Sequence, residues 1–442
     1  MAVIGAGVVG ITTAHALHVD GHEVTVFERH GSIASEASFA NAGVMAPGYV
    51  TPWAAPGMGR KVVGQLFQHD AAVRLAGLPG PALAAWLWRW QRACAPAGYM
   101  KRRAAMLALA HDSLARTRAM VRDHDIDYER GRGMLVLLRG DKELALARAG
   151  LKLLADSTQD FHLVDAARCR EIEPALSEAT ALRAGIHLPD AEVGNCRQFA
   201  LQIKALLQER GVGVRLHHEV RQLQVGNGVE LHATAVTDDS GGRHAARPVV
   251  EHFDAAVVCA ANGAPSLLQP LHLRLPLQPV YGYSVTLPVR QHEAHPDIGP
   301  RAALMDERYK VAISRLGDRL RVAGSAELGG HPERLREAAL QTLYRVVDDW
   351  FPGASSHVQP QTWKGARPML PDGPPAIGPS GAPGVWVNTG HGSSGWALAC
   401  GSARLVADLM VGRTSAIDPQ PFSPLRWRWR SPAAARSPTP MC

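Results

Sequence analysis

The sequence of 442 residues predicts an α/β fold, and three patterns support this prediction. Residues 2–28 alternate strand, glycine-rich turn, helix and strand, which is typical of the start of a parallel βαβ unit. Residues 277–326 contain three strand-like stretches in succession, so this part of the chain is expected to be rich in β-strands. Near the C-terminus, the strand-like GVWVNTG leads through GHGSSG into a helix, so a second strand–turn–helix unit is expected there.

The N-terminal turn, VIGAGVVG, has the spacing of a dinucleotide-binding site. Gly5 permits the tight turn, Gly7 allows a pyrophosphate to approach, and Gly10 lets the helix pack on the strand. Free N–H groups at the helix start favour phosphate binding. Glu28 ends the second strand, where an acid binds the ribose hydroxyls of NAD or FAD. The alternative is a tight turn that binds no ligand.

Periodicity and turn residues predict the elements between these two ends. Residues 36–59 are rich in glycine and proline and should be irregular, while their apolar and aromatic content favours a functional loop over disorder. We predict helices at 8–19, 60–125, 141–155, 163–176, 196–210, 332–350 and 393–411. Strands are predicted at 2–4, 22–28, 128–139, 211–225, 253–263, 278–288, 308–315, 318–327 and 384–390.

Composition and charge restrict the class of protein. The formal net charge is +7, but much of the excess lies in the Arg-rich end of the chain, and no compact basic–aromatic module occurs, so we expect no nucleic-acid partner. The six cysteines form no C-x-x-C pair and no zinc-type spacing with histidine, which predicts no metal site and a reducing compartment. Without a signal peptide or an 18-residue apolar run, a cytoplasmic location is expected.

The segments beyond the second strand favour FAD over NAD. An NAD domain would continue as regular βα units, whereas here the glycine- and alanine-rich stretch FANAGV follows directly. At the far end of the chain, GHGSSG opens a helix, and a helix N-terminus stabilises the negative charge that a flavin gains on reduction. An ordinary strand–helix connection is the alternative for GHGSSG.

These features resemble the FAD-dependent D-amino acid oxidase superfamily and, within it, the bacterial D-amino acid dehydrogenases. The similarity runs in the family's order over residues 1–412, and the loop after the second strand and the two C-terminal motifs are its specific parts. The matching stretches are VIGAGVVG, GHEVTVFER, ANAGVMAPGYVTPWAAPGM, GYSVTLP, GARPMLPDGPPAIGP and NTGHGSSGWALACGSARLVADLM.

The resemblance implies an α/β fold with a discontinuous, Rossmann-like FAD-binding domain and a substrate domain built on a mixed or antiparallel sheet. The FAD-binding domain would comprise residues 1–59, 155–270 and 360–412, and the substrate domain residues 60–154 and 271–359. Residues 413–442, rich in Pro, Ser and Arg, would form a loosely ordered C-terminal tail.

The resemblance also implies which residues contact FAD. Four groups are expected: the first turn and second strand, the following loop, a short backbone segment at the adenine side, and two glycine turns near the dinucleotide. They are Gly5, Ala6, Gly7, Val8, Val9, Gly10, Glu28, Arg29, Ser38, Asn41, Ala42, Gly43, Val44, Val220, Ala260, Ala261, Gly263, Gly390, Gly392, Ser393, Gly395 and Trp396.

Three residues are predicted to meet the substrate. Arg367 stands where related enzymes hold an amino acid's carboxylate, which the planar guanidinium binds through two hydrogen bonds; the alternative is a structural salt bridge, for instance with Asp372. Tyr309 is a candidate to cap the substrate, or else a sheet aromatic, and Tyr49 a candidate to line the entrance. His391 is interpreted as a structural part of its loop.

The activity that the resemblance implies is oxidative deamination of a D-amino acid, with electrons passed to a quinone or another carrier. Oxidation of a secondary, imino-type amino acid such as a D-proline-type substrate is an alternative, and so is a non-catalytic FAD-binding subunit. Relatives that oxidise glycine or sarcosine often carry an arginine in the glycine-rich loop where Ser393 stands, which argues against those substrates here.

The tryptophan-rich stretch PALAAWLWRWQRAC at 81–94 has two interpretations. Trp86, Trp88 and Trp90 could form an interfacial helix that contacts the inner face of the cell membrane, which would suit electron delivery to a membrane quinone. The interpretation that we favour is a domain helix with its tryptophans in the core.

Overall fold

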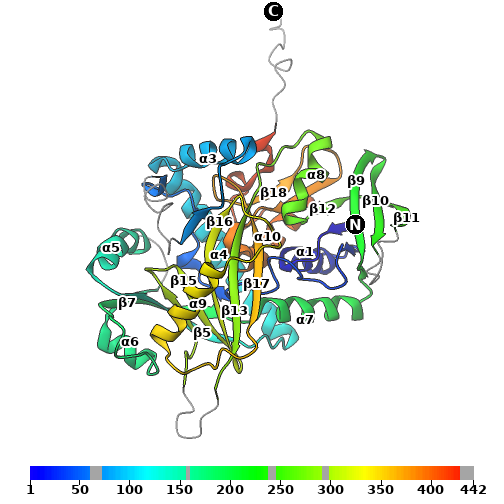
Figure 1. Ribbon diagram of the computed structural model, residues 1–442. Helices are drawn as coiled ribbons and strands as arrows, with labels where there is room; N and C mark the ends of the chain where they lie inside the picture. The colour runs from blue at the N-terminus through cyan, green and yellow to red at the C-terminus, as the bar shows by residue number, and fades with distance from the viewer. Residues whose placement is uncertain (60–71, 156–159, 237–244, 291–297, 429–442) are drawn as a thin grey trace, which may run out of the picture.

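The computed structural model describes residues 1–59, 72–155, 160–236, 245–290 and 298–428, and confirms the α/β prediction (Figure 1). A six-stranded sheet has the order β18-β19-β12-β1-β2-β8. All its neighbouring strands pair in parallel except β18 and β19. The strands are β1 (Ala2–Ile4), β2 (Thr25–Phe27), β8 (Gly213–Arg215), β12 (Ala256–Val258), β18 (Ala376–Pro379) and β19 (Val385–Thr389).

A larger, curled sheet is the mixed sheet that the family resemblance implied. Its order is β17-β13-β16-β15-β14-β5-β7-β3, with β4 paired to β16 and β6 to β7, and it mixes antiparallel with parallel pairs. Its strands are β3 (Val44–Met45), β4 (Val73–Leu75), β5 (Gly131–Leu138), β6 (His162–Asp165), β7 (Ala184–Val193), β13 (Gln278–Pro288), β14 (Ala303–Asp306), β15 (Val311–Leu316), β16 (Arg319–Leu328) and β17 (Gln361–Met369).

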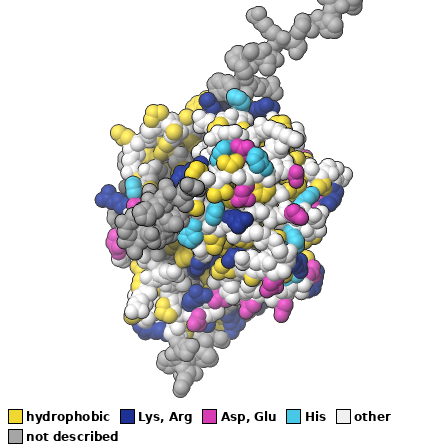
Figure 2. Space-filling view, turned by 90° about the vertical axis from the view of Figure 1, so that its right-hand side faces the viewer, with side chains coloured by type: hydrophobic (Ala, Val, Ile, Leu, Met, Phe, Trp, Pro, Cys, Tyr) yellow, Lys and Arg dark blue, Asp and Glu magenta, His cyan; other side chains and the backbone are white. Residues whose placement is uncertain are grey.

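A third sheet lies at the right-hand side of Figure 1 and was only partly predicted. It contains β9 (His218–Gly226), β10 (Gly228–Val236) and β11 (Ala245–Phe253), all antiparallel. Figure 2 shows this side of the molecule, where basic, acidic and histidine side chains are interspersed rather than gathered by sign.

The two faces of the larger sheet have different neighbours. On β13, Tyr283, Val285 and Leu287 point into a hydrophobic cluster that the helix α9 (Glu337–Trp350) completes. Because side chains alternate along a strand, Ser284 and Thr286 point to the opposite face. That opposite face meets the loop that follows β2, and it holds the candidate site described below.

The helices match most of the predicted ones. They are α1 (Val8–Val19), α3 (Pro81–Ala93), α4 (Pro96–His124), α5 (Asp141–Ala155), α6 (Ala166–Ile172), α7 (Cys196–Glu209), α8 (Ala264–Leu268), α9 and α10 (Gly395–Met410). Part of the predicted 60–125 helical region, residues 60–71, lies outside the described residues, and β4 interrupts the rest. None of the described helices combines the length and apolarity needed to cross a bilayer.

The structure favours the core interpretation for two of the three tryptophans of α3. The side chains of Trp86 and Trp90 are 2% and 4% exposed and contact the ring of Trp53. Trp88 points outward, 59% exposed, with Arg92 over its ring. Membrane contact of this helix stays a prediction.

The start of the predicted C-terminal tail is packed, which corrects the expectation that all of it is loosely ordered. Phe422 is fully buried, and Arg426 pairs with Asp372 at 2.8 Å while donating to the carbonyls of Pro374 and Pro375. Residues 429–442 lie outside the described residues. The division into domains stays a prediction, since the larger sheet also takes β3, β6, β7 and β17 from segments assigned to the FAD-binding domain.

Helices α1 and α10 run side by side in the same direction. Thr12 Oγ1 donates to the carbonyl of Ala399 at 3.2 Å, and eight residues further along α1, Asp20 pairs with Arg404 of α10. Their N-termini, at Gly7 and Ser394, therefore lie at the same end of the pair. Both helix starts belong to the glycine-rich turns that the sequence singled out.

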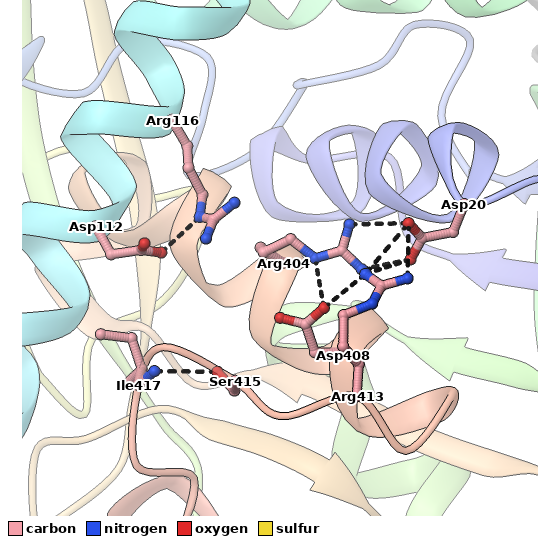
Figure 3. Close-up of polar contacts among 8 residues, drawn as sticks. All are labelled: Asp20, Asp112, Arg116, Arg404, Asp408, Arg413, Ser415 and Ile417. Carbon is pink, nitrogen blue, oxygen red and sulfur yellow. Dashed lines mark hydrogen bonds and ion pairs between the residues drawn. The ribbon is translucent and has the colours of Figure 1, made fainter.

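An ion cluster joins the other ends of these two helices (Figure 3). Asp20, at the C-terminus of α1, accepts hydrogen bonds from Arg404 and Arg413, and Asp408 pairs with the same two arginines at 3.0 and 2.8 Å. An acid at a helix C-terminus is unfavourable by itself, and the two arginines offset that charge. The hydrogen bond from Arg404 lowers the pKa of Asp20, so the folded state favours its ionised form.

We therefore expect Asp20→Asn to lower the free energy of unfolding by about 1–3 kcal/mol at neutral pH, because it leaves two arginines without this partner. The pKa of Asp20 is lower in the folded state, so this stabilisation is present above its usual value of 3.8 and is lost as the pH falls through the folded value. Thermal unfolding of both proteins from pH 7 to pH 3 measures it.

Asp123→Asn is the matched control, because the Arg122–Asp123 pair is exposed. It should change stability little at any of these pH values. Equal effects of the two variants would contradict a structural role for the cluster.

Candidate active site

The first glycine turn has the packing that the sequence predicted. Gly5 has φ +99°, and a Cβ there would lie 2.8 Å from the carbonyl oxygen of Cys259. A Cβ on Gly10 would lie 1.8 Å from the carbonyl oxygen of Gly5, so only glycine lets α1 approach β1. At Gly7, by contrast, the nearest atom would be Ser38 Oγ at 3.5 Å, so a Cβ at the start of α1 would not collide with the protein.

Glu28 is buried and lies against the first glycine turn. Its Oε2 accepts a hydrogen bond from the backbone N–H of Ala6 at 2.8 Å, and its Oε1 accepts one from His30 at 3.0 Å. The two contacts fix the carboxylate beside the turn, and each oxygen keeps a further lone pair for a ligand hydroxyl. Arg29 pairs with Glu36 of the following loop.

The loop after β2 is held by the larger sheet. Ser284 donates to the carbonyl of Ala40 at 2.8 Å, Arg321 to that of Asn41 at 3.1 Å, and Ser314 to that of Ala42 at 2.6 Å. Three consecutive carbonyls are thus bound by side chains from β13, β16 and β15. Nearby, Ser38 Oγ accepts from the N–H of Val8, and Asn41 Oδ1 accepts from that of Gly43.

Strand β17 brings Arg367 next to two of the predicted turns. The short helices η2 (Ala261–Gly263) and η4 (Gly392–Ser394) both contact β17. Asn262 Nδ2 donates to the carbonyl of Ala366 at 3.1 Å, and His391 forms a β-bridge with Met369. Arg367 therefore lies between Ala366 and Met369, the two residues of β17 that Asn262 and His391 contact.

Arg367 has no acidic partner among the residues that the structure describes. Its Nη1 donates to the carbonyl of Ser325 at 2.8 Å, and Ser325 has φ +62° at an irregularity in the β13–β16 pairing. The salt bridge with Asp372 that the sequence allowed does not form, because Asp372 pairs with Arg426. Burial lowers the pKa of Arg367 to about 10, which reflects the cost of holding this cation away from water.

Two buried polar atoms beside Arg367 also lack partners within the described chain: His391 Nε2 and Asn262 Oδ1. His391 is 4% exposed, and burial lowers its pKa to about 3, so the ring is neutral at physiological pH. Buried polar groups are normally hydrogen-bonded, so these two atoms indicate a place for a bound group.

The structure brings Tyr49 to this face of the sheet but not Tyr309. The Tyr49 hydroxyl donates to Glu307 Oε2 at 2.9 Å, and burial raises its pKa well above the usual value. The ring of Tyr309 packs in the cluster under α9, with the guanidinium carbon of Arg139 5.1 Å from its centre. This agrees with the alternative of a sheet aromatic.

The remaining predicted residues fall into turns and core. Ala261, Gly390 and Gly392 have positive φ values of 47°, 79° and 59°, Ala260 precedes η2, and Gly263 is its last residue. Ser393 is exposed and Gly395 begins α10, whereas the indole of Trp396 packs against Tyr128 and Phe199 in the core. Val220 is buried on β9 opposite Ala233, and Val44 begins β3.

Comparison with known proteins decides the family. The model of the DAO family, described as FAD dependent oxidoreductase, matches residues 1–409. The chain belongs to the DAO family of FAD-dependent oxidoreductases. It is 38% identical over 420 residues to a D-amino acid dehydrogenase of Chromohalobacter salexigens, covering 94% of this chain and 97% of that protein. A Vibrio cholerae D-amino acid dehydrogenase is 38% identical over 411 residues, with 92% and 94% covered.

A solved structure shows the same fold at lower sequence similarity. The glycine oxidase of Bacillus cereus superposes with a TM-score of 0.68 at 20% identity, covering 94% of this chain and 95% of its own. At that identity the likeness shows the fold alone.

The residues of this DAO-family chain fit FAD. At Gly7 a Cβ would meet no atom closer than 3.5 Å, so the backbone there and at the start of α1 suits a pyrophosphate, and Glu28 suits ribose hydroxyls. The other glycine turn leads into α10, whose N-terminus would stabilise negative charge on the flavin. When bound, FAD would supply the two-electron oxidation that defines the family.

Several residues that hold the site have no recognisable sequence pattern. Ser284, Ser314 and Arg321 lie 244 to 280 residues from the carbonyls that they bind. A serine or arginine on a strand has no local pattern that marks such a contact. Asn262 lies within a predicted turn, but no local pattern marks its contact with the carbonyl of Ala366.

The different surroundings of Gly7 and Gly10 give a test of the FAD site. Gly7→Ala should leave the stability of the apoprotein nearly unchanged but weaken FAD binding by about tenfold or more, since its methyl group enters the pyrophosphate space. Gly10→Ala should also destabilise the apoprotein, because its methyl group would collide with Gly5. Thermal unfolding of the apoproteins and FAD-fluorescence titration measure both effects.

Full FAD affinity in Gly7→Ala would contradict the assignment of the first turn. Gly77→Ala serves as the control glycine: like Gly7 it has no positive φ, a Cβ there would meet nothing within 4 Å, and it lies outside the turn.

Proposed function

We propose that this protein oxidatively deaminates D-amino acids to 2-oxo acids and ammonia and passes the electrons to a quinone or another carrier. The observation that carries the proposal is Arg367, a cation beside the two glycine turns with no acidic partner among the described residues. The relatives at 38% identity are named D-amino acid dehydrogenase, which supports the D-configuration and an acceptor other than oxygen.

The α-carboxylate of an amino acid is the natural counter-ion for Arg367. A guanidinium without an anion in a partly buried site is costly, and a carboxylate offsets this cost through two parallel hydrogen bonds. The carbonyl of Ser325 takes only Nη1, so N–H groups of the fork remain for the substrate. A structural salt bridge would have supplied the acid from the protein.

The neighbours of Arg367 suit the amino group. Asn262 Oδ1 is an acceptor, and a neutral His391 neither repels a substrate amine by charge nor needs to lose a proton before accepting a hydrogen bond. With the carboxylate on Arg367 and the amine toward these groups, the Cα–H of one enantiomer would face the flavin. The oxidised product is an imine, which water hydrolyses to the 2-oxo acid and ammonia.

Replacement of Arg367 tests the proposal. Arg367→Ala should raise the KM for a D-amino acid by about a hundredfold or more while the flavin content stays normal, because a charge-assisted, two-point contact is lost. Arg367→Lys should recover part of the loss, since the charge returns without the fork. Steady-state kinetics with an artificial electron acceptor and the visible flavin spectrum provide the two readouts.

Arg122→Ala, at an exposed arginine of α4, is the matched control and should behave as the wild type. Unchanged KM in Arg367→Ala would remove the basis of the proposal.

A further inference from the structure

We propose that Trp363 determines substrate specificity: its indole, which lies next to the Arg367 guanidinium, forms the wall of the pocket that receives the substrate's side chain. The preferred substrates would accordingly carry a large apolar side chain. This inference rests on the proposed function, because it takes Arg367 as the carboxylate-binding group.

The register of β13 and β17 places Trp363 on the same face as Arg367. The antiparallel pairs are Ser284 with Trp363, Gly282 with Gly365, and Val280 with Arg367. Side chains two apart along a strand share a face, so Trp363 and Arg367 lie on either side of Gly365 on one face. Ser284 binds the loop after β2 from that face, so the indole faces the FAD-binding side.

A pair of glycines makes room for both side chains. A Cβ on Gly365 would lie 1.8 Å from Cη2 of the Trp363 ring, and a Cβ on Gly282 would lie 2.3 Å from Nη2 of Arg367. The ring and the guanidinium therefore fold over two residues that are directly opposite each other, where Cβ atoms would be only about 5 Å apart. The indole edge and the guanidinium therefore lie next to each other over the backbone of two residues that have no side chains.

Trp363 is not a core residue. Trp86 and Trp350 are 2% and 0% exposed and belong to hydrophobic clusters, whereas Trp363 is partly exposed and belongs to none of the five clusters found in the described chain. A large apolar ring that contributes nothing to the core, and that lies beside a cation without an acidic partner, has the composition of a ligand-binding wall.

The two sides of Arg367 then recognise different parts of the substrate, the amine on one side and the side chain on the other. Met369, two residues after Arg367, is bridged to His391, so the partner-free Nε2 of His391 lies toward that end. Trp363 lies at the other end of the same strand segment. A carboxylate on Arg367 places the α-carbon between them, and its side chain toward the indole, where an apolar group gains by leaving water.

The experiment compares D-alanine, D-leucine and D-phenylalanine with wild type and Trp363→Ala by anaerobic flavin reduction. We expect the wild type to favour the two larger substrates. In Trp363→Ala, the second-order rate constant of flavin reduction should fall by about tenfold or more for D-leucine and D-phenylalanine and by no more than about threefold for D-alanine. Trp88→Ala, at the exposed tryptophan of α3, is the control and should change none of them.

A binding measurement separates this inference from the proposed function. Perturbation of the oxidised flavin spectrum gives the Kd of phenylacetate and of acetate, neither of which is oxidised. Trp363→Ala should weaken phenylacetate by about tenfold and leave acetate unchanged. If no D-amino acid reduces the flavin of the wild type, the proposed function fails. The titration still tests whether Trp363 forms the wall of an apolar pocket.

Gly365→Ala provides a second variant in case Trp363→Ala does not fold with FAD. Its methyl group displaces the indole without deleting it, and the same selective loss is expected. Equal losses for all three substrates, or no loss for any, would overturn the proposal, because a wall for the side chain must discriminate by side-chain size.

Discussion

An arginine that lacks an acidic partner is the constraint on which the centre of this molecule depends. The guanidinium of Arg367 is held by one carbonyl, that of Ser325, and rests over Gly282, whose missing side chain makes its place. Desolvation without an ion pair is costly, and a fold keeps such a group only where surrounding structure fixes it. The positive φ of Ser325 and the irregular pairing of β16 with β13 direct that carbonyl at Arg367, and this backbone conformation is strained.

Segments from both ends of the chain converge on this position. The short helices η2 and η4 follow β12 and β19 of the six-stranded sheet, and Asn262 and His391 beside them contact β17. Helices α1 and α10 start at the two glycine turns, and their opposite ends are joined by the Asp20–Arg404–Asp408–Arg413 cluster. The larger sheet, in turn, fixes the loop after β2 through three consecutive carbonyls. The FAD-binding side and the substrate side are thereby built against each other.

Features that depend on local sequence were predictable, and features that depend on distant contacts were not. Gly5, Gly10 and Glu28 occupy their expected places because turn geometry and strand ends are local properties. Arg367 was found by its motif, but whether it would pair with Asp372 depended on Arg426, 54 residues further along, in a segment expected to be loose. Tyr309 and Trp396 carry residue types that suit a site, yet tertiary packing places their rings in the α9 cluster and in the core. Trp363 gave no sequence signal, since only the pairing of two glycines across β13 and β17 shows where its ring lies.

The central claim is that Arg367 is kept free for a substrate's carboxylate. The most direct test is anaerobic titration of the FAD-loaded protein with D-alanine and with D-alaninamide, which keeps the amine and the Cα–H but lacks the anionic carboxylate. Loss of the oxidised flavin's visible absorbance reports the reaction. The account predicts bleaching by D-alanine and none by D-alaninamide at the same concentrations. Equal bleaching by both compounds would show that the carboxylate does not matter and would contradict the role of Arg367.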